Sequence, residues 1–465
     1  MTKFFKSNKY ACITSGAVFL VMLTTLFILR LGVADNGYLT GRLVSMGLYD
    51  AQGASGTGYY SMLFGIADKT ISFMPSDLLY SIFKMVFPKD AIIPALFPAV
   101  IYMILAVWGV FMIVKALVSE TKWNNILLCA LIVLIVAETG YVTFFNTPYE
   151  CGAAISYFIP MMGALLMSIK YEKVRYAIIF GVFGILFSGT MPQSGAVGII
   201  IAFYSLYLAF KQTRTQRIIF ALTGVLIIAG SVLGLTRISD ADKYNSVFYG
   251  VANSENAAYS AVLSELKIIG KDELAGVDYF KKDAQEFITS PDFDGIMRNV
   301  NPLKVAKLYA KNPEYMRLSF KSACNNSVFI KTEYLGNYPV SSGKAGEVSS
   351  FFSMYSTVKK AIVPTNFVVL AVMFGAIILF ALDYKKKYAF NDATKNTCVL
   401  SVFLTVAALI SLVVPPLYFG RAQIGFNLII YNLVFDALVF GCAVGGTKLL
   451  AVKRNILREK FGVNQ

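Results

Sequence analysis

Long, continuous runs of apolar residues recur along the chain of 465 residues, and short polar stretches separate most of them. A run of about 20 apolar residues crosses the hydrocarbon core of a bilayer as an α-helix. The runs do not alternate between apolar and polar positions, as the strands of a membrane barrel would. The pattern therefore predicts an all-α polytopic membrane protein with about ten transmembrane helices, near residues 11–32, 92–114, 126–145, 152–169, 176–190, 193–210, 218–236, 363–382, 397–416 and 424–447.

Two long polar stretches interrupt this series, and both fall on the same predicted side. The first is rich in Gly, Ser and Tyr, and the second contains helical-looking segments such as residues 302–310 and 313–323. We expect both to fold as a helical cap on the outer ends of the spans. The predicted parts are the N-terminal tail with the first helix (1–32), the first outer loop (33–91), helices two to seven (92–236), a large extracytoplasmic segment (237–362), and the last three helices with a basic tail (363–465).

Charged residues are divided unevenly between the two sides. With the N-terminus inside, the inner segments hold 20 of the 42 Lys and Arg residues but only five of the 27 Asp and Glu residues. The outer segments then hold 22 of each, so the whole formal charge of +15 lies on the inner side. Basic inner loops are typical of membrane proteins, because they remain in the cytoplasm and meet anionic lipid head groups. The pattern predicts two cytoplasmic termini and no nucleic-acid partner.

The composition also limits the chemistry. Histidine is absent, which removes the usual base at neutral pH and the commonest metal ligand. The motif Asp292-Phe293-Asp294, which binds metal in nucleotide-sugar enzymes, is interpreted as a solvated loop because it lies outside. We predict no metal site and no cofactor, and the use of a divalent cation stays open. No CxxC spacing or disulfide framework is evident, although a bridge between Cys151 and Cys324 is an alternative; the six cysteines are Cys12, Cys129, Cys151, Cys324, Cys398 and Cys442.

The stretch Val33–Tyr38 comes directly after the first apolar run, where the chain leaves the bilayer. It contains Asp35, whose depth is fixed by the preceding helix at the boundary between lipid and water. A lipid-borne substrate would present its head group there. Asn36 and Gly37 are also ordinary turn residues, so a plain turn is the alternative interpretation.

Other polar residues near the spans gather at the outer ends, and such residues are costly enough to need a reason. A structural ion pair or snorkelling is the favoured interpretation for Arg30 and Glu138, and packing for the deeper Asp436. Glu150 and Arg421 are candidates for function. A carboxylate and cations at the membrane surface suit sugar transfer from a lipid phosphate. The phosphate is a good leaving group, one carboxylate can accept the proton of the acceptor hydroxyl, and Arg or Lys can bind the phosphate.

Four stretches also carry a family resemblance. They occur within the first 290 residues or so, in the same order as in the family. The chain resembles the integral-membrane glycosyltransferases of the GT-C superfamily. More narrowly, it is similar to bacterial glycan-biosynthesis hexose transferases of the WsfD type. The stretches are Asp35–Gly37 with Gly47–Tyr49, Phe144–Glu150, Pro192-Gln193, and Tyr244–Gly250 leading to Glu265-Leu266.

The resemblance implies a GT-C-like fold in the bacterial plasma membrane, a sugar donor linked to polyprenyl phosphate, and inverting transfer. The acceptor would be a cell-surface polysaccharide or a lipid-linked glycan on the outer face. Asp35 would be the base or would position the acceptor. The chain has Thr190-Met191 where the family commonly has a basic residue, so phosphate binding falls to Arg42, Lys331 or Arg421. The implied substrate-binding residues are Asn36, Arg42, Asn146, Tyr149, Glu150, Gln193, Tyr244, Tyr249, Lys331 and Arg421.

Two other classes of protein compete with the enzyme. A transporter or flippase of a lipid-linked glycan needs polar groups through both halves of the membrane, and often shows repeat symmetry. The sequence shows neither. A non-catalytic partner in glycan assembly would instead present a glycan through the large outer segment.

Overall fold

The computed structural model describes residues 6–461 except 212, 253–258, 269, 329 and 333. The side chains of residues 448 and 451–461 also lie outside the description. The predictions for the first five residues and for the basic side chains of the tail therefore fall outside the described residues.

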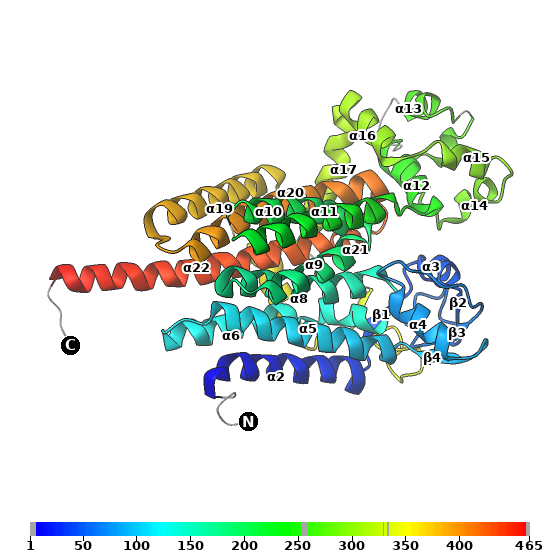
Figure 1. The fold of residues 1–465 in the computed structure, drawn as a ribbon. Helices are drawn as coiled ribbons and strands as arrows, with labels where there is room; N and C mark the ends of the chain where they lie inside the picture. The colour runs from blue at the N-terminus through cyan, green and yellow to red at the C-terminus, as the bar shows by residue number, and fades with distance from the viewer. Residues whose placement is uncertain are drawn as a thin grey trace.

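Long helices run side by side and form a bundle (Figure 1). Within the described part of the chain, eight helical segments are long and apolar enough to cross a membrane. The first joins α2 (Lys9–Leu23) to a π-helical turn, η1 (Thr24–Ile28). The others are α5 (Leu96–Leu117), α8 (Glu150–Tyr171), α10 (Pro192–Ala209), α11 (Arg214–Thr236), α19 (Phe367–Tyr388), α20 (Asp392–Phe419) and α22 (Ile429–Phe461), of which Ile429–Thr447 is the apolar part.

The two remaining predicted spans have a different form. The region predicted at 126–145 is α6 (Lys122–Val136), followed after a bend of 47° by α7 (Thr139–Val142) and η2 (Thr143–Asn146). The region predicted at 176–190 is α9 (Val174–Ser188), an apolar helix of only 15 residues. The described residues thus contain eight spans, or nine if the bent pair counts as one. The predicted class, an all-α polytopic membrane protein, is confirmed.

Small residues allow the central helices to approach closely. At the crossing of α5 and α8, a Cβ atom added to Gly109 would lie 2.5 Å from the backbone nitrogen of Pro160. One added to Gly163 would lie 2.8 Å from the carbonyl oxygen of Gly109. Lipid supplies little hydrophobic force between helices, so this kind of close backbone contact stabilises membrane bundles. Helix α8 is the most enclosed of these helices, since 94% of its most apolar stretch is buried.

The first outer loop contains short strands that hydropathy did not predict. Strands β2 (Leu48–Asp50), β3 (Leu63–Ile66) and β4 (Ile92–Pro94) form an antiparallel sheet, flanked by α3 (Leu39–Ser45) and α4 (Leu78–Val86). A separate pair joins β1 (Gly32–Val33) to β5 (Leu335–Asn337). This pair ties the segment just before Asp35 to the far end of the second outer segment.

Most of the second outer segment forms a helical cap with its own hydrophobic core, whereas its last helix, α18 (Met354–Ile362), packs on α6 of the bundle. Tyr244, Phe248, Phe287 and Met297 are among its buried residues. The expected helical character is present, but the helices are short and several were not anticipated. They are α12 (Asp240–Ser246), η3 (Val247–Val251), α13 (Tyr259–Glu265), η4 (Asp272–Leu274), α14 (Lys282–Ile288), α15 (Phe293–Arg298), α16 (Pro302–Lys311), α17 (Pro313–Asn326) and α18 (Met354–Ile362).

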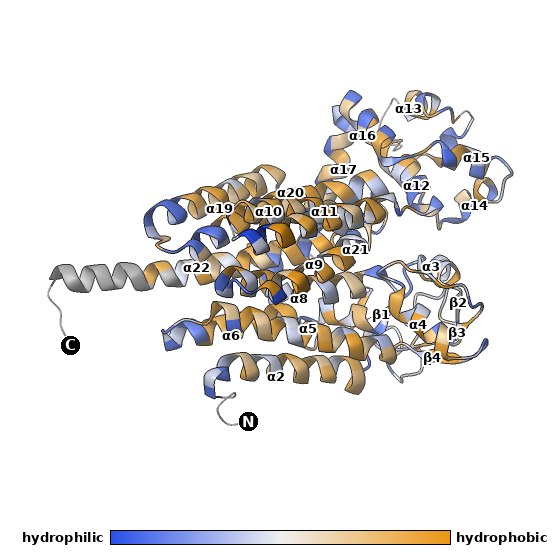
Figure 2. Ribbon diagram, in the orientation of Figure 1, coloured by the Kyte–Doolittle hydropathy of each residue, from blue (hydrophilic) through white to orange (hydrophobic). Residues whose placement is uncertain are grey.

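The bundle has two chemically different ends. Both outer segments lie at one end, whereas the start of α2 and the end of α22 lie at the other (Figure 1). Apolar residues dominate the middle of the bundle, and hydrophilic residues gather in the cap and at the opposite helix ends (Figure 2). We call these the cap end and the basic end. The arrangement matches the placement of termini and loops that the charge pattern requires, and the side of the membrane stays a prediction.

Candidate functional site

Asp35 lies where the first span meets the first outer loop, and its side chain is held by backbone groups. Asp35 is 4% exposed. Oδ1 accepts a hydrogen bond from the backbone N–H of Gly37 at 2.8 Å, and Oδ2 accepts one from Gly56. Gly37 has φ of 93°, a conformation that glycine adopts without strain. The loop therefore forms the predicted turn and also fixes the direction of the carboxylate.

The neighbouring Asn36 connects this turn to the start of α8. Its Oδ1 accepts a hydrogen bond from the Tyr149 hydroxyl at 2.9 Å, and its backbone oxygen accepts one from Nε2 of Gln423 at 3.3 Å. Asn36 is 7% exposed, and its Nδ2 has no hydrogen-bond partner among the described residues. A buried amide nitrogen without a partner loses about 1–3 kcal/mol of solvation, which a ligand acceptor would restore.

A polar cavity of about 340 Å³ opens beside Asn36. This volume falls in the range of about 300–1,000 Å³ that is usual for sites of small organic ligands. Residues far apart in sequence meet there, since the first outer loop, the cap, the segment near β5 and the turn after α20 all contribute. The lining residues are Asn36, Tyr249, Asp278, Phe280, Lys281, Tyr334, Arg421 and Gln423.

Arg421 is positioned by a tight turn between α20 and α21 (Ile424–Asn427). The guanidinium lies over the ring of Tyr249, 5.1 Å from its centroid, and the Arg421 N–H donates to the Tyr249 carbonyl at 3.1 Å. Gly420 has φ of 60°, and a Cβ there would lie 2.3 Å from the carbonyl oxygen of Asn245. The turn therefore packs closely on the cap, and this contact brings Arg421 to the cavity wall.

The cap adds one carboxylate and one further cation to the cavity. Asp278 accepts a hydrogen bond from the N–H of Phe280 at 2.9 Å. Burial raises the pKa of Asp278, whereas that hydrogen bond and the nearby Lys281 lower it, and the net effect is upward. A carboxylate with a raised pKa in a cleft is a candidate for proton transfer. The cavity thus combines two cations, one carboxylate and two tyrosines.

Behind Asn36 and Tyr149 lies a cluster of two carboxylates and two guanidiniums, which we call the four-charge cluster: Arg42, Asp77, Glu150 and Arg237. Arg42 contacts Asp77 at 2.5 Å and Glu150 at 3.2 Å. Arg237 contacts both carboxylates at 3.3 Å. Arg42 and Asp77 are almost fully buried, whereas the side chains of Glu150 and Arg237 are 24% and 21% exposed. The cluster is balanced in charge and reaches water on one side.

The electrostatics of this cluster favour charged forms. Burial raises the pKa of Asp77, but Arg42 and Arg237 lower it by more, so the net pKa lies well below its ordinary value. Burial lowers the pKa of Arg42, and Glu150 and Asp77 raise it by more. Asp242 lies near the cluster and keeps partial exposure, yet burial raises its pKa to about 6. At neutral pH Asp77 and Arg42 are therefore both ionised.

The structure brings several predicted site residues together. Asn36, Tyr249 and Arg421 line the polar cavity, and Asp35 precedes Asn36 in the same turn. Tyr149 joins Asn36, while Arg42 and Glu150 belong to the four-charge cluster.

Four predicted residues lie elsewhere, and their roles stay predictions. Asn146 is fully buried and donates to the carbonyls of Leu26 and Leu31. Gln193 donates to the Asn427 carbonyl at 3.1 Å. Tyr244 lies in the core of the cap. Lys331 donates to the Ser349 carbonyl and the Ser353 hydroxyl, and burial lowers its pKa although Glu138 raises it.

Sequence reasoning missed Asp77, Arg237, Asp278, Lys281 and Gln423. Four of them lie in the two outer segments and Gln423 lies in the short turn after α20, where polar residues are common, so hydropathy gave no reason to select them. Arg237 carried the only usable signal, because it follows the last apolar residues of α11 directly, as Asp35 follows the first span.

The remaining residues that the sequence singled out lie away from the polar cavity. Glu138 accepts hydrogen bonds from the backbone and hydroxyl of Ser356 in α18. Asp436 pairs with Lys359 at 2.7 Å. Asp292 and Asp294 lie exposed at the start of α15. Cys151 and Cys324 are both free thiols. Among the described residues, no group of three or more His, Cys, Asp and Glu side chains could hold a metal ion.

Comparison with known proteins gives one finding about the chain as a whole. The model of the YfdI N-terminal transmembrane domain family matches residues 1–461. The match therefore covers the bundle, both outer segments and the candidate site. No curated protein gives a significant match.

Proposed function

Since the chain belongs to the YfdI N-terminal transmembrane domain family, we propose that it is a membrane glycosyltransferase of the GT-C type. It transfers a sugar from a polyprenyl-phosphate donor onto a glycan outside the cytoplasm, with inversion at the anomeric carbon. The family match and the apolar helices support the membrane setting and a glycosyltransferase-like role. The donor, the acceptor and the narrower likeness to WsfD-type hexose transferases are part of the proposal.

The observation that carries the proposal is the convergence on the polar cavity. Asn36, Tyr249 and Arg421 come from three distant segments and line one cavity at the cap end. Asp35 adjoins it through the same turn. A cavity with two cations and an amide nitrogen that has no partner among the described residues suits a ligand that carries both a phosphate and sugar hydroxyls.

In the proposed reaction, Arg421 and Lys281 bind the phosphate and stabilise the charge that grows on it. The acceptor hydroxyl attacks the anomeric carbon, and the bond between that carbon and the phosphate oxygen breaks. The phosphate leaves with the bonding electrons, so no general acid is needed. The hydroxyl proton passes to a carboxylate. Asp35 is the proposed base, and Asp278, which lines the cavity directly, is the structural alternative.

The four-charge cluster supports the site from behind. It holds the start of α8 against the first outer loop, because Glu150 and Arg42 belong to those two elements. We propose that this support keeps Tyr149 and Asn36 in place while substrate binds.

The two competing functions lead to different expectations. A flippase needs a polar path through the membrane. The bundle has a second cavity, at its basic end, and the lining of that cavity is mostly apolar. A non-catalytic partner in glycan assembly would need the cap but no base.

A transfer assay in proteoliposomes separates these functions. Polyprenyl phosphate carrying a radiolabelled hexose is the donor, and membrane glycans from the producing cell are the acceptor. We expect Asp35→Asn to fold normally and to lower the transfer rate by roughly 10²–10⁴-fold, the usual contribution of a positioned base. Asp278→Asn is measured beside it to identify the base. Asp68→Asn, which changes an exposed carboxylate in the same loop, is the matched control.

The outcomes discriminate clearly. If only Asp278→Asn is inactive, the enzyme stands and the base is reassigned. If wild-type protein moves labelled lipid between leaflets without forming product, the protein is a flippase. If a chelator abolishes transfer, a divalent cation joins the mechanism.

A further inference from the structure

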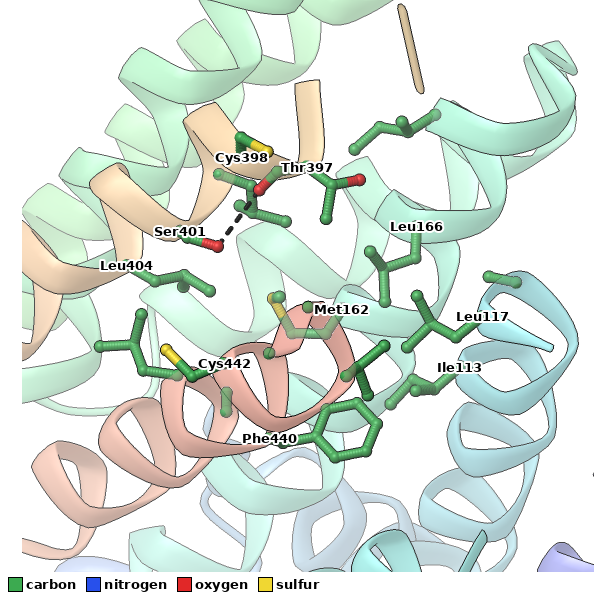
Figure 3. Close-up of a pocket in the computed structure, with 18 of the residues that line it drawn as sticks. Ile113, Leu117, Met162, Leu166, Thr397, Cys398, Ser401, Leu404, Phe440 and Cys442 are labelled. Carbon is green, nitrogen blue, oxygen red and sulfur yellow. Dashed lines mark hydrogen bonds between the residues drawn. The ribbon is translucent and has the colours of Figure 1, made fainter. Parts of the chain in front are cut away.

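The bundle contains a second cavity, at the opposite end from the polar one. It measures about 410 Å³ and lies among α5, α6, α8, α19, α20 and α22. Figure 3 shows side chains from several of these helices pointing into one space, among them Ile113, Leu117, Met162, Leu166 and Phe440. The lining is apolar over most of its area. A long hydrocarbon chain is the chemistry that fits such a lining within a membrane.

The mouth of this cavity is polar and lies at the basic end. Lys170 at the end of α8, Tyr384 near the end of α19, and Asn391 and Thr394 at the start of α20 line it. Asn391 caps α20 by accepting from the N–H of Thr394 at 2.7 Å. The start of a long helix carries partial positive charge, which favours an anion.

Basic residues exceed acidic ones around this mouth. Lys385, Lys386, Lys387 and Lys395 lie on the adjoining turns of α19 and α20, against Asp383 and Asp392. Both acids are already paired, Asp383 with Lys387 at 2.7 Å and Asp392 with Lys395 at 3.3 Å. The surroundings of Lys170 therefore keep an excess of positive charge, which complements an anionic head group.

One carboxylate, Asp436, lines the deep end of the cavity. Its charge is neutralised by other groups, so it does not prevent a hydrocarbon chain from binding there. Asp436 is fully buried and pairs with Lys359 at 2.7 Å. It also accepts hydrogen bonds from the hydroxyls of Tyr141 at 2.5 Å and Tyr355 at 2.8 Å. Its charge is compensated from the far side, so the cavity keeps an apolar interior.

We propose that this cavity binds one acyl chain of an anionic phospholipid from the leaflet at the basic end. The chain occupies the space between Leu166 and Phe440, and the phosphate lies at the mouth beside Lys170. The site is separate from the proposed catalytic site, whose polar cavity lies at the cap end. A donor lipid that serves that site has its head group in the other leaflet. The second cavity is therefore a resident lipid site, and it does not depend on the proposed function.

The test uses the full chain in nanodiscs of phosphatidylcholine that contain a minor fraction of photoactivatable phosphatidylglycerol, with the reactive group near the end of one acyl chain. After illumination, labelled peptides are mapped by mass spectrometry. We expect labels on the lining segments of α5, α8 and α22, and weaker labelling with a phosphatidylcholine probe of the same design.

Two pairs of variants make the test specific. Met162→Trp fills the cavity and should lower labelling of α22 by roughly tenfold or more, because each CH₂ group excluded from an apolar site weakens binding. Leu222→Trp, at a position 57% exposed on α11, adds the same bulk outside the cavity and should not. Lys170→Gln should remove the preference for phosphatidylglycerol, whereas Lys173→Gln in the neighbouring loop should keep it. Ile113→Phe, a smaller change, replaces Met162→Trp if that variant does not fold.

Equal labelling of α22 in wild type and in the filled variants would overturn the proposal. So would labels confined to the outer faces of the helices. If unlabelled polyprenyl phosphate competes with the probe and phosphatidylglycerol does not, the cavity belongs to the carrier lipid and the proposed occupant is wrong.

Discussion

Two groups of opposite charges in this protein are built from similar residues but differ in their surroundings. The four-charge cluster lies at the cap end, where Glu150 and Arg237 keep 24% and 21% exposure. The pair of Lys359 and Asp436 lies inside the bundle, with side chains 2% and 0% exposed. The first group can respond to an ion arriving from water, whereas the second is sealed.

The buried pair is also more completely hydrogen-bonded than the four-charge cluster. Lys359 donates to Asn432 at 2.6 Å as well as to Asp436, and the hydroxyls of two tyrosines donate hydrogen bonds to the Asp436 carboxylate. In the four-charge cluster, Nη1 of Arg42 has no hydrogen-bond partner among the described residues, although it lies 3.2 Å from Glu150. The saturated pair fixes α18 on α22, whereas, within the described part of the chain, this nitrogen of the four-charge cluster is held by an ion pair alone. Charge inside a membrane protein is therefore not a guide to function until its partners are known.

The largest expected effect concerns the sealed pair. Lys359→Met leaves Asp436 buried without its cation, which should lower the free energy of unfolding by about 3–5 kcal/mol. The transfer rate per folded molecule should not change. Unfolding in mixtures of detergent and SDS measures the first quantity, with the exposed neighbour Lys360→Met as control. If the Lys359→Met protein is stable but inactive, Lys359 and Asp436 take part in function and the structural assignment is wrong.

The next prediction concerns the open cluster. Arg237→Gln removes a guanidinium that contacts Asp77 and Glu150, and we expect transfer to fall by about 100-fold, because a small displacement of the groups that the cluster supports can cost that much. Stability should also fall, by about 1–3 kcal/mol, because Asp77 stays buried with one of its two cations removed. Arg298→Gln, at an exposed position of the cap, is the control. Loss of stability with an unchanged rate would make the cluster purely structural.

Acid should destabilise the protein in part through Asp77 of the four-charge cluster. The pKa of Asp77 is lower in the folded protein than its ordinary value of 3.8. Its contribution to stability is therefore fully present above that value and is lost as the pH falls through the folded pKa. We expect the melting temperature of the wild type to decrease between about pH 5 and pH 3, and that of Asp77→Asn to decrease less. Parallel curves for the two proteins would show that Asp77 gains nothing from its partners.

The smallest effect is expected at the hydrogen bond that links the two parts of the site. Tyr149→Phe removes the hydroxyl that donates to Asn36, which should cost about 1 kcal/mol of stability. Tyr80→Phe is a matched control, because the buried Tyr80 hydroxyl has no hydrogen-bond partner among the described residues. Unfolding measured for both variants compares them directly. Equal losses would mean that the Asn36 contact contributes nothing net.

The sequence alone determined the class of the protein and predicted where its candidate site lies. Apolar runs predict spans because burial in lipid depends on local composition. The structure departs from this rule at two places: after the bend beyond α6 every residue of α7 and η2 is buried, and α9 is short although Ile178 and Val182 on it are exposed. The position of Asp35 followed from the same local rule, because the end of a span fixes the depth of the next residue.

Only the tertiary structure decided which polar residues meet. Arg42 pairs with Asp77 nearby in sequence and shares it with Arg237, 160 residues further along, and no local pattern encodes that contact. The cavity wall likewise joins Asn36 to Asp278 and Arg421. Hydropathy and turn chemistry act over one element at a time, whereas these contacts depend on how helices cross and how the cap folds back. The same reason hid the Lys359 partner of Asp436, which a hydropathy plot shows only as a lone acid in a span.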